Sequence, residues 1–138
     1  MIGGVEVIDF HGHVGRWDSL GMPDDPDGVL RAMDAAGIDR ACVFNIFHPH
    51  GAPGNDRIAA LVAAHPQRFI GFVYVSPLVA AGMVAQLERG IDRLGLRAIK
   101  LYSPYTPYEY DNPVWDPVYR FAADRSLTII AHTGSDAQ

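Results

Sequence analysis

The chain has 138 residues, of which 49% are hydrophobic, 20% charged and 10% aromatic. This composition is typical of a globular protein with one domain and excludes a disordered or fibrous chain. Eleven basic residues against 16 acidic ones give a net charge of -5 without a basic stripe, so we expect neither nucleic acid nor an anionic membrane surface as a partner.

Short β-rich runs alternate with longer amphipathic segments along the chain. The predicted strands cover 5–10, 41–46, 69–75, 96–101 and 128–131. The predicted helices between them cover 26–36, 55–64, 80–94 and 116–124. Gly37 is expected to stop the first helix, and Asn55 is expected to be the N-cap of the second. Because the strands are nearly continuous apolar runs, the order predicts a parallel sheet covered by helices.

Cysteine usage and the absence of a targeting signal bear on the compartment. The single cysteine, Cys42, lies in an apolar run and cannot form an internal disulfide, so it is expected to be a small buried hydrophobe. Residues 1–6 contain neither a basic region nor a long apolar run, so no signal peptide is expected. The uncharged stretch 69–87 is divided by Ser76 and Pro77, which favours a strand and a helix over a membrane span. We expect a soluble, cytoplasmic protein.

Polar residues that follow the predicted strands are the first candidates for function, because chemistry in parallel α/β proteins lies beyond the carboxyl ends of the strands. These residues are His11, His13, Asn45, His48, His50, Tyr102 and His132. His65 follows a helix instead, so it is expected at the opposite end of the sheet, near the negative end of the helix dipole.

The clearest pattern is Asp-Phe-His-Gly-His at 9–13, at the end of the first predicted strand. Because side chains alternate along a strand, Asp9, His11 and His13 are expected on one face. Two imidazoles placed in this way can bind one cation, and histidine nitrogens suit Zn²⁺ and similar divalent metals. Gly12 leaves room either for the metal or for a close backbone. Asp9 either orients a histidine or accepts backbone hydrogen bonds.

A third histidine, His132, ends the fifth predicted strand. In a barrel of parallel strands, its side chain would reach the same edge as His11 and His13. We therefore predict that His11, His13 and His132 bind one divalent metal, which we expect to be zinc.

Five segments together resemble the amidohydrolase-related family that includes aminocarboxymuconate-semialdehyde decarboxylase, the amidohydrolase 2 group. The segments that carry the resemblance, in order, are 8–13, 33–41, 65–72, 95–101 and 130–134. The resemblance implies an α/β fold, the N-terminal part of a metal-dependent hydrolase (β/α)8 TIM barrel with about five parallel strands and four helices. A complete barrel needs roughly 250 residues, so residues 1–138 are expected to be one domain truncated after the fifth strand.

The resemblance also implies the site and the activity. In this family the first-strand histidine pair and the fifth-strand histidine bind a divalent metal, commonly zinc, and these positions are His11, His13 and His132 here. The family's sixth-strand histidine and eighth-strand aspartate have no counterpart in this chain, so the catalytic acid or base is not assigned. Members are hydrolases or decarboxylases of small aromatic, muconate-like or lactone substrates. A metal-bound water or a metal-polarised substrate would serve either reaction.

Lys100 is the only lysine, and it closes the fourth apolar strand, where an unpaired ammonium is costly. Three interpretations are open. The lysine could be carbamylated between two metals, as in binuclear relatives, or its ammonium could hold a substrate carboxylate. The third interpretation is an ion pair within the barrel or a side chain that points out among the helices.

Loop residues near the strand ends are the remaining candidates for substrate binding. Arg16 and Trp17 follow the histidine pair and could supply a carboxylate clamp and an aromatic wall. His48 lies at the pocket rim, and Tyr102 begins a tyrosine-rich loop that suits an aromatic or carboxylated substrate. With Lys100, these residues complete the predicted substrate-binding set.

Two other functions compete with a metal-dependent hydrolase or carboxy-lyase acting on a small molecule. A phosphoesterase-type His-x-His barrel is disfavoured because residues 14–17 lack the Ser/Thr and Ser-Asp-Gly pattern of that group. A non-catalytic half barrel that acts as an assembly module would have to cover the open edges of its first and fifth strands, and a homo-oligomer could do so.

Overall fold

The computed structural model describes residues 3–16, 24–48, 50–79 and 82–134. In chain order, its strands are β1 (Ile8–His13), β2 (Arg40–Phe44), β3 (Phe69–Tyr74), β4 (Ala98–Leu101) and β5 (Ile129–Ala131). Its α-helices are α1 (Pro26–Ala36), α2 (Ala52–Ala64), α3 (Met83–Glu88) and α4 (Asp116–Asp124). A π-helical turn, η2 (Arg89–Arg93), continues α3, and two short 3₁₀ turns, η3 (Ser103–Tyr105) and η4 (Pro113–Trp115), precede α4.

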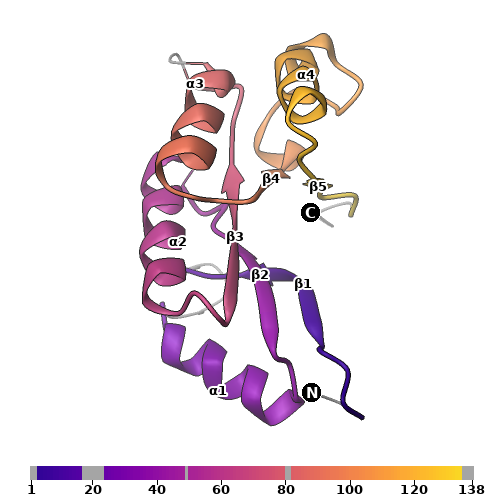
Figure 1. The fold of residues 1–138 in the computed structure, drawn as a ribbon. Coiled ribbons are helices and arrows are strands. Elements are labelled where there is room, and N and C mark those ends of the chain that lie inside the picture. Colours follow the sequence, from indigo (N-terminus) through magenta and orange to yellow (C-terminus); the bar gives the residue numbers. More distant parts are fainter. Residues whose placement is uncertain (1–2, 17–23, 49, 80–81, 135–138) are drawn as a thin grey trace.

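The five strands form one parallel sheet in the order β1-β2-β3-β4-β5. Helices α1, α2 and α3 follow one another along one side of this sheet, and α4 lies beside the ends of β4 and β5 (Figure 1). The predicted order and direction of the strands and the four predicted helices are therefore confirmed. Sheet and helices together make a curled half barrel.

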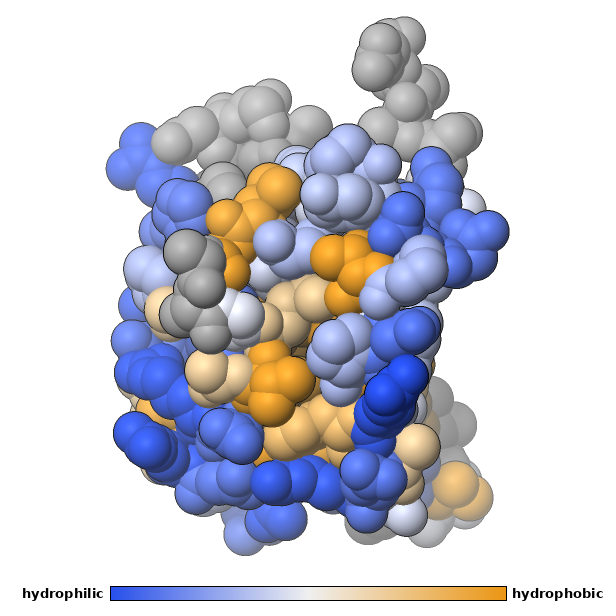
Figure 2. Space-filling view, turned by 90° about the horizontal axis from the view of Figure 1, so that it is seen from above, coloured by the Kyte–Doolittle hydropathy of each residue, from blue (hydrophilic) through white to orange (hydrophobic). Residues whose placement is uncertain are grey.

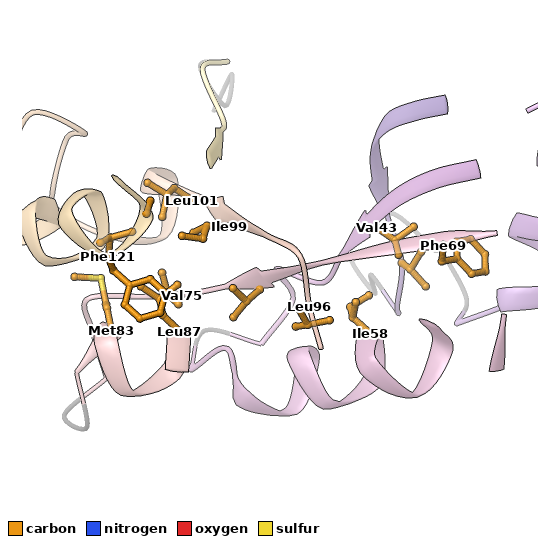
Figure 3. Close-up of a cluster of buried hydrophobic side chains, with 14 of the residues drawn as sticks. Val43, Ile58, Phe69, Val75, Met83, Leu87, Leu96, Ile99, Leu101 and Phe121 are labelled. Atoms are coloured by element: carbon orange, nitrogen blue, oxygen red, sulfur yellow. The ribbon is translucent and has the colours of Figure 1, made fainter. Parts of the chain in front are cut away.

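Alternation along the strands divides the buried side chains into two layers. The outer layer joins the sheet to its helices and includes Val43 of β2, Ile58 of α2, Ile99 of β4 and Phe121 of α4 (Figure 3). The inner layer lies on the other face of the sheet and contains Cys42, Phe44, Ile46, Phe72, Tyr74, Ala98 and Tyr102. All of these inner-layer side chains are buried, so the inner face is packed within this chain.

Two helix predictions need correction. Helix α2 begins at Ala52 behind Gly51, so Asn55 is not its N-cap. The Asn55 side chain instead donates to the Tyr74 carbonyl (2.8 Å) and accepts from the Tyr74 N–H (2.9 Å), which satisfies both backbone groups at the end of β3. Residues 80 and 81 of the predicted helix 80–94 lie outside the described residues, and the rest is divided, because α3 begins at Met83 and passes into η2.

The turn η2 brings a helix backbone close to the sheet. A Cβ atom on Gly90 would lie 2.5 Å from Cγ2 and 2.8 Å from Cβ of Val73 in β3, so only glycine fits there without a shift of the helix. In the described ranges, no helix is long and apolar enough to cross a membrane.

Candidate functional site

A β-bulge in β1 decides where the two histidines lie. Asp9 pairs with Ala41 and Gly12 pairs with Val43, so β1 uses one more residue than β2 over this interval. Ala41 and Val43 belong to the outer layer, and strict alternation from Asp9 would place both histidines there as well. Because of the extra residue, His13 pairs with Phe44 of the inner layer instead.

Asp9 and the histidines therefore do not share one face, which corrects the alternation expected from the sequence. The Asp9 carboxylate accepts a hydrogen bond from the backbone N–H of His11 at 3.0 Å, so it serves the backbone of the bulge and not an imidazole. Gly12 permits a close backbone, since a Cβ atom there would lie 3.0 Å from the Cys42 carbonyl oxygen. His11 and His13 lie within β1, which begins later and extends further than predicted.

The imidazoles of His11 and His13 converge. Their Nε2 atoms lie 3.2 Å apart, and their ring centroids are 5.2 Å apart. Both rings also meet Phe44 edge-to-face, with centroid distances of 5.0 Å for His11 and 4.7 Å for His13. The histidine pair is thus in contact with a fully buried aromatic ring of the next strand.

Lys100 points into the same inner layer. Its side chain is fully buried, and its ammonium lies 4.5 Å from the centroid of the Phe44 ring and 6.0 Å from that of Tyr102. The nitrogen has no hydrogen-bond partner in the described part of the chain. Of the three open interpretations, the third finds no support within the described residues, where Lys100 has no ion-pair partner and its ammonium lies over Phe44 on the inner face.

His132 and Tyr102 form a second aromatic group at the ends of β4 and β5. Their ring centroids lie 4.7 Å apart, and the tilted ring of Tyr105 contacts Tyr102 with a centroid distance of 4.6 Å. Tyr102 is buried, whereas His132 is half-buried. Lys100 connects this group to Phe44 and the histidine pair, so the structure brings together five predicted site residues from β1, β4 and β5 and the residues that follow them.

The family of this chain is shown by a match that covers nearly all of its sequence. The model of the family described as Amidohydrolase matches residues 8–138, which includes every element of the fold. The chain belongs to this family. The resemblance noted in the sequence is therefore confirmed.

Solved structures of similar fold include two decarboxylases and a hydratase. A 2,6-dihydroxybenzoate decarboxylase from Rhizobium is 18% identical with a TM-score of 0.78, over 96% of this chain and 52% of that one. A 5-carboxyvanillate decarboxylase from Novosphingobium aromaticivorans was solved with bound manganese and 3-methoxy-4-hydroxy-5-nitrobenzoic acid. It is 18% identical with a TM-score of 0.78, over 96% of this chain and 52% of that one. A 4-oxalomesaconate hydratase from Rhodopseudomonas palustris is 20% identical with a TM-score of 0.70, over 92% of this chain and 52% of that one. This amidohydrolase chain spans about half the length of those structures.

Burial and neighbouring charge tune the titratable groups of the amidohydrolase inner face. Desolvation, followed by the charge of Lys100, lowers the pKa of His13 to about 4 and also lowers that of His11. Desolvation lowers the pKa of Lys100 to about 8 and raises that of Tyr74 to about 12. At neutral pH both histidines are therefore uncharged, which is the form that binds metals, and Tyr74 keeps its proton.

The histidine pair fits a metal ion. Two nitrogens bound to one tetrahedral Zn²⁺ at about 2.0–2.1 Å lie roughly 3.3 Å from each other. The observed separation of 3.2 Å between the Nε2 atoms of His11 and His13 agrees with this spacing. Within the described residues, no three side chains of His, Cys, Asp or Glu form a group that could hold a metal, so His132 does not yet complete a three-ligand set with the pair.

The remaining predicted substrate residues lie in the loops that follow β1 and β2. His48 is exposed in the loop after β2, where its carbonyl accepts a hydrogen bond from Gly51 N–H. Arg16 is exposed three residues after His13, and Trp17 lies outside the described residues. Figure 2 shows the molecule from above, relative to the view of Figure 1. On this face, apolar residues gather at the centre and hydrophilic residues surround them.

Sequence reasoning missed Phe44 and Tyr74, which both belong to the inner layer. Phe44 touches both histidines and Lys100. Tyr74 pairs with Lys100 in the register of β3 and β4, so their side chains leave the sheet on the same face. Period-two alternation from Cys42 or Phe72 could have indicated both residues, but an apolar strand run by itself does not say which face is the inner one.

Proposed function

We propose that this chain provides the first half of the active site of a metal-dependent carboxy-lyase that acts on a small aromatic carboxylic acid. The observation that carries the proposal is the convergence of the His11 and His13 Nε2 atoms at 3.2 Å on the inner face of an amidohydrolase half barrel. Two of the similar structures are decarboxylases of hydroxylated benzoic acids, which supports the reaction class.

In this proposal His11 and His13 hold a divalent cation, with His132 as a third ligand. Imidazole nitrogens favour zinc, and one similar structure contains manganese, so both ions belong in the test. When bound, the cation would polarise a substrate oxygen and stabilise negative charge that develops during the reaction.

The residues of the chain supply the rest of the proposed environment. Lys100 provides the positive charge that attracts an anionic substrate, and most of its amine is protonated at pH 7 because its pKa is about 8. The rings of Phe44 and Tyr102 keep water away from this charge, which strengthens its attraction for an anion. Because Lys100 is fully buried, a substrate can reach it only if the inner-layer side chains move apart.

Hydration or hydrolysis is the second candidate, since a structure of similar fold is a hydratase. A cation held by the histidine pair would assist the addition of water to a carbonyl or an alkene as well as the loss of CO₂. The products separate the two reactions, because only decarboxylation releases CO₂.

The metal site is tested by titrating the purified metal-free protein with Zn²⁺ and with Mn²⁺ in a calorimeter. We expect one ion per chain in the wild type and loss of binding in His11→Ala. His50→Ala is the matched control, because His50 is an exposed histidine of the loop after β2. A wild type that binds neither ion, or a His11→Ala variant that binds as the wild type does, would refute the site.

The substrate class is tested with a panel of hydroxybenzoates and unsaturated acids, by CO₂ release and by product analysis. Because Lys100 is the only lysine, protein labelled with ¹³C at the lysine ε carbon gives a single lysine signal. Binding of 2,6-dihydroxybenzoate is expected to raise the Lys100 pKa above 8. An unchanged titration would remove Lys100 from the substrate site, whereas water addition without CO₂ would favour the hydratase candidate.

A further inference from the structure

The ring of Phe44, in the inner layer, meets both histidines of β1. It contacts His11 and His13 edge-to-face, at interplanar angles of 75° and 73°. Because both contacts are made by one rigid ring, the position of this ring constrains the orientation of both imidazoles at once. Edge-to-face contacts of this kind have a preferred geometry, because the positive edge of one ring faces the negative face of the other.

Phe44 itself is held firmly in place. It has no exposed surface, it packs on Phe72 at 6.2 Å, and the Lys100 ammonium lies over its ring at 4.5 Å. Its backbone is paired directly with His13 in the register of β1 and β2. The position of the ring is therefore fixed by the backbone pairing with β1, by Phe72 of β3 and by Lys100 of β4.

The histidines need such a support. His11 is exposed and His13 is only partly buried, and both belong to an edge strand whose register is interrupted by a bulge. An exposed imidazole normally populates several rotamers, and a metal site has to restrict both rings to the one arrangement in which their nitrogens meet. Contact with the Phe44 ring limits each imidazole without occupying the Nε2 atom that would bind the ion.

We propose that Phe44 is a positioning residue for divalent-cation binding, because its ring fixes both imidazoles so that their Nε2 atoms face one point. The inference rests on the proposed function, since it concerns the same histidine pair. The inference goes beyond that function because it gives an apolar residue of β2 a part in setting the metal affinity. In this proposal the residue contacts neither substrate nor metal.

The test compares Phe44→Leu with the wild type in the full 138-residue chain. The Kd for Zn²⁺ is measured by competition with a chromogenic chelator, and the visible spectrum of the Co²⁺-loaded protein reports the ligand geometry. We expect the Kd to rise about 10- to 100-fold, as after loss of other supporting contacts in metal sites. We also expect the Co²⁺ spectrum to change.

Phe69→Leu is the matched control. Phe69 is an equally buried phenylalanine that meets a histidine edge-to-face, but this histidine, His65, is at the other end of the sheet. Both variants should lower Tm, and only Phe44→Leu should change the Kd and the spectrum. If Phe44→Leu does not fold, Phe44→Met, which is closer in volume, takes its place.

The outcomes separate this inference from the function on which it rests. A wild type that binds neither Zn²⁺ nor Co²⁺ overturns the metal site itself and the inference with it. A wild type that binds through His11, together with a Phe44 variant that keeps the wild-type Kd and spectrum, overturns only the positioning role.

Discussion

Replacement of Lys100 by methionine is expected to stabilise the chain at neutral pH. Lys100 has no exposed surface, and desolvation lowers its pKa from 10.5 to about 8. Since a pKa difference of one corresponds to about 1.4 kcal/mol, burial of the charged amine costs about 3 kcal/mol of stability at pH 7. Methionine keeps the unbranched shape and gives up the cation–π contact with Phe44, which is worth about 1 kcal/mol.

The net gain is therefore about 2 kcal/mol, or an increase in Tm of roughly 5–8 °C for a chain of this size. The pH dependence gives a sharper test than the size of the gain. Between pH 8 and 10.5 the unfolded state binds more protons at Lys100 than the folded state, so the penalty in the wild type disappears as the pH rises through this window. The stability difference between the variant and the wild type should shrink accordingly.

Urea denaturation of both proteins at pH 7, 8 and 9.5 measures this difference. The comparison stops below pH 10, because buried Tyr74, with a pKa of about 12, destabilises the fold once tyrosine ionises in the unfolded chain. The ε-¹³C signal of the single lysine gives the folded-state pKa independently. A variant that is less stable than the wild type at pH 7, or a difference that stays constant with pH, would refute the reasoning.

Three further predictions concern the supports of the site. Asn55→Ala leaves the Tyr74 N–H and carbonyl without their side-chain partners and should cost about 2–4 kcal/mol in urea denaturation. In metal-free buffer, the wild type should lose Tm as the pH falls from 6.5 towards 4, because the low pKa of His13 makes the folded state resist protonation, and His13→Gln should lose less. Gly90→Ala should cost about 1–3 kcal/mol through its clash with Val73, and Val73→Ala in the same chain should recover part of this loss in a double-mutant cycle.

Each of these predictions has an outcome that would contradict it. Asn112→Ala removes only one cap contact, with Val114 N–H, and should cost about 1 kcal/mol, so an equal cost for Asn55→Ala would contradict the role given to Asn55. A His13→Gln profile with the wild-type slope would count against the pKa argument. Strict additivity of Gly90→Ala and Val73→Ala would show that the clash does not exist.

The order of strands and helices could be predicted because each element carries its own signal. Helix α1 begins at Pro26 behind the N-cap Asp25 and ends at Gly37 with a φ of 69°, and these local features are visible in the sequence. Helix α4 likewise has the predicted bounds. Asn55 misled the prediction of α2, because its amide bonds to the β3 backbone, a contact that joins residues 19 positions apart.

The candidate site could be predicted only in part. The His-x-His motif and the position of His132 at a strand end indicated a metal site. However, the side of the sheet on which His11 and His13 lie depends on the pairing of β1 with β2. The direction of Lys100 depends in the same way on which face of β4 the helices cover. These are relations between strands, and no single strand contains them.

The bulge in β1 takes up one residue between Asp9 and the histidine pair, and this bears on how related chains are aligned. Deletion of Phe10, the one residue between Asp9 and His11, would remove the bulge and leave both histidines opposite inner-layer residues of β2, so the imidazoles would stay on the inner face. In an alignment of related chains, a one-residue gap at this point would therefore identify proteins that keep the inner histidine pair on a regular strand without the bulge.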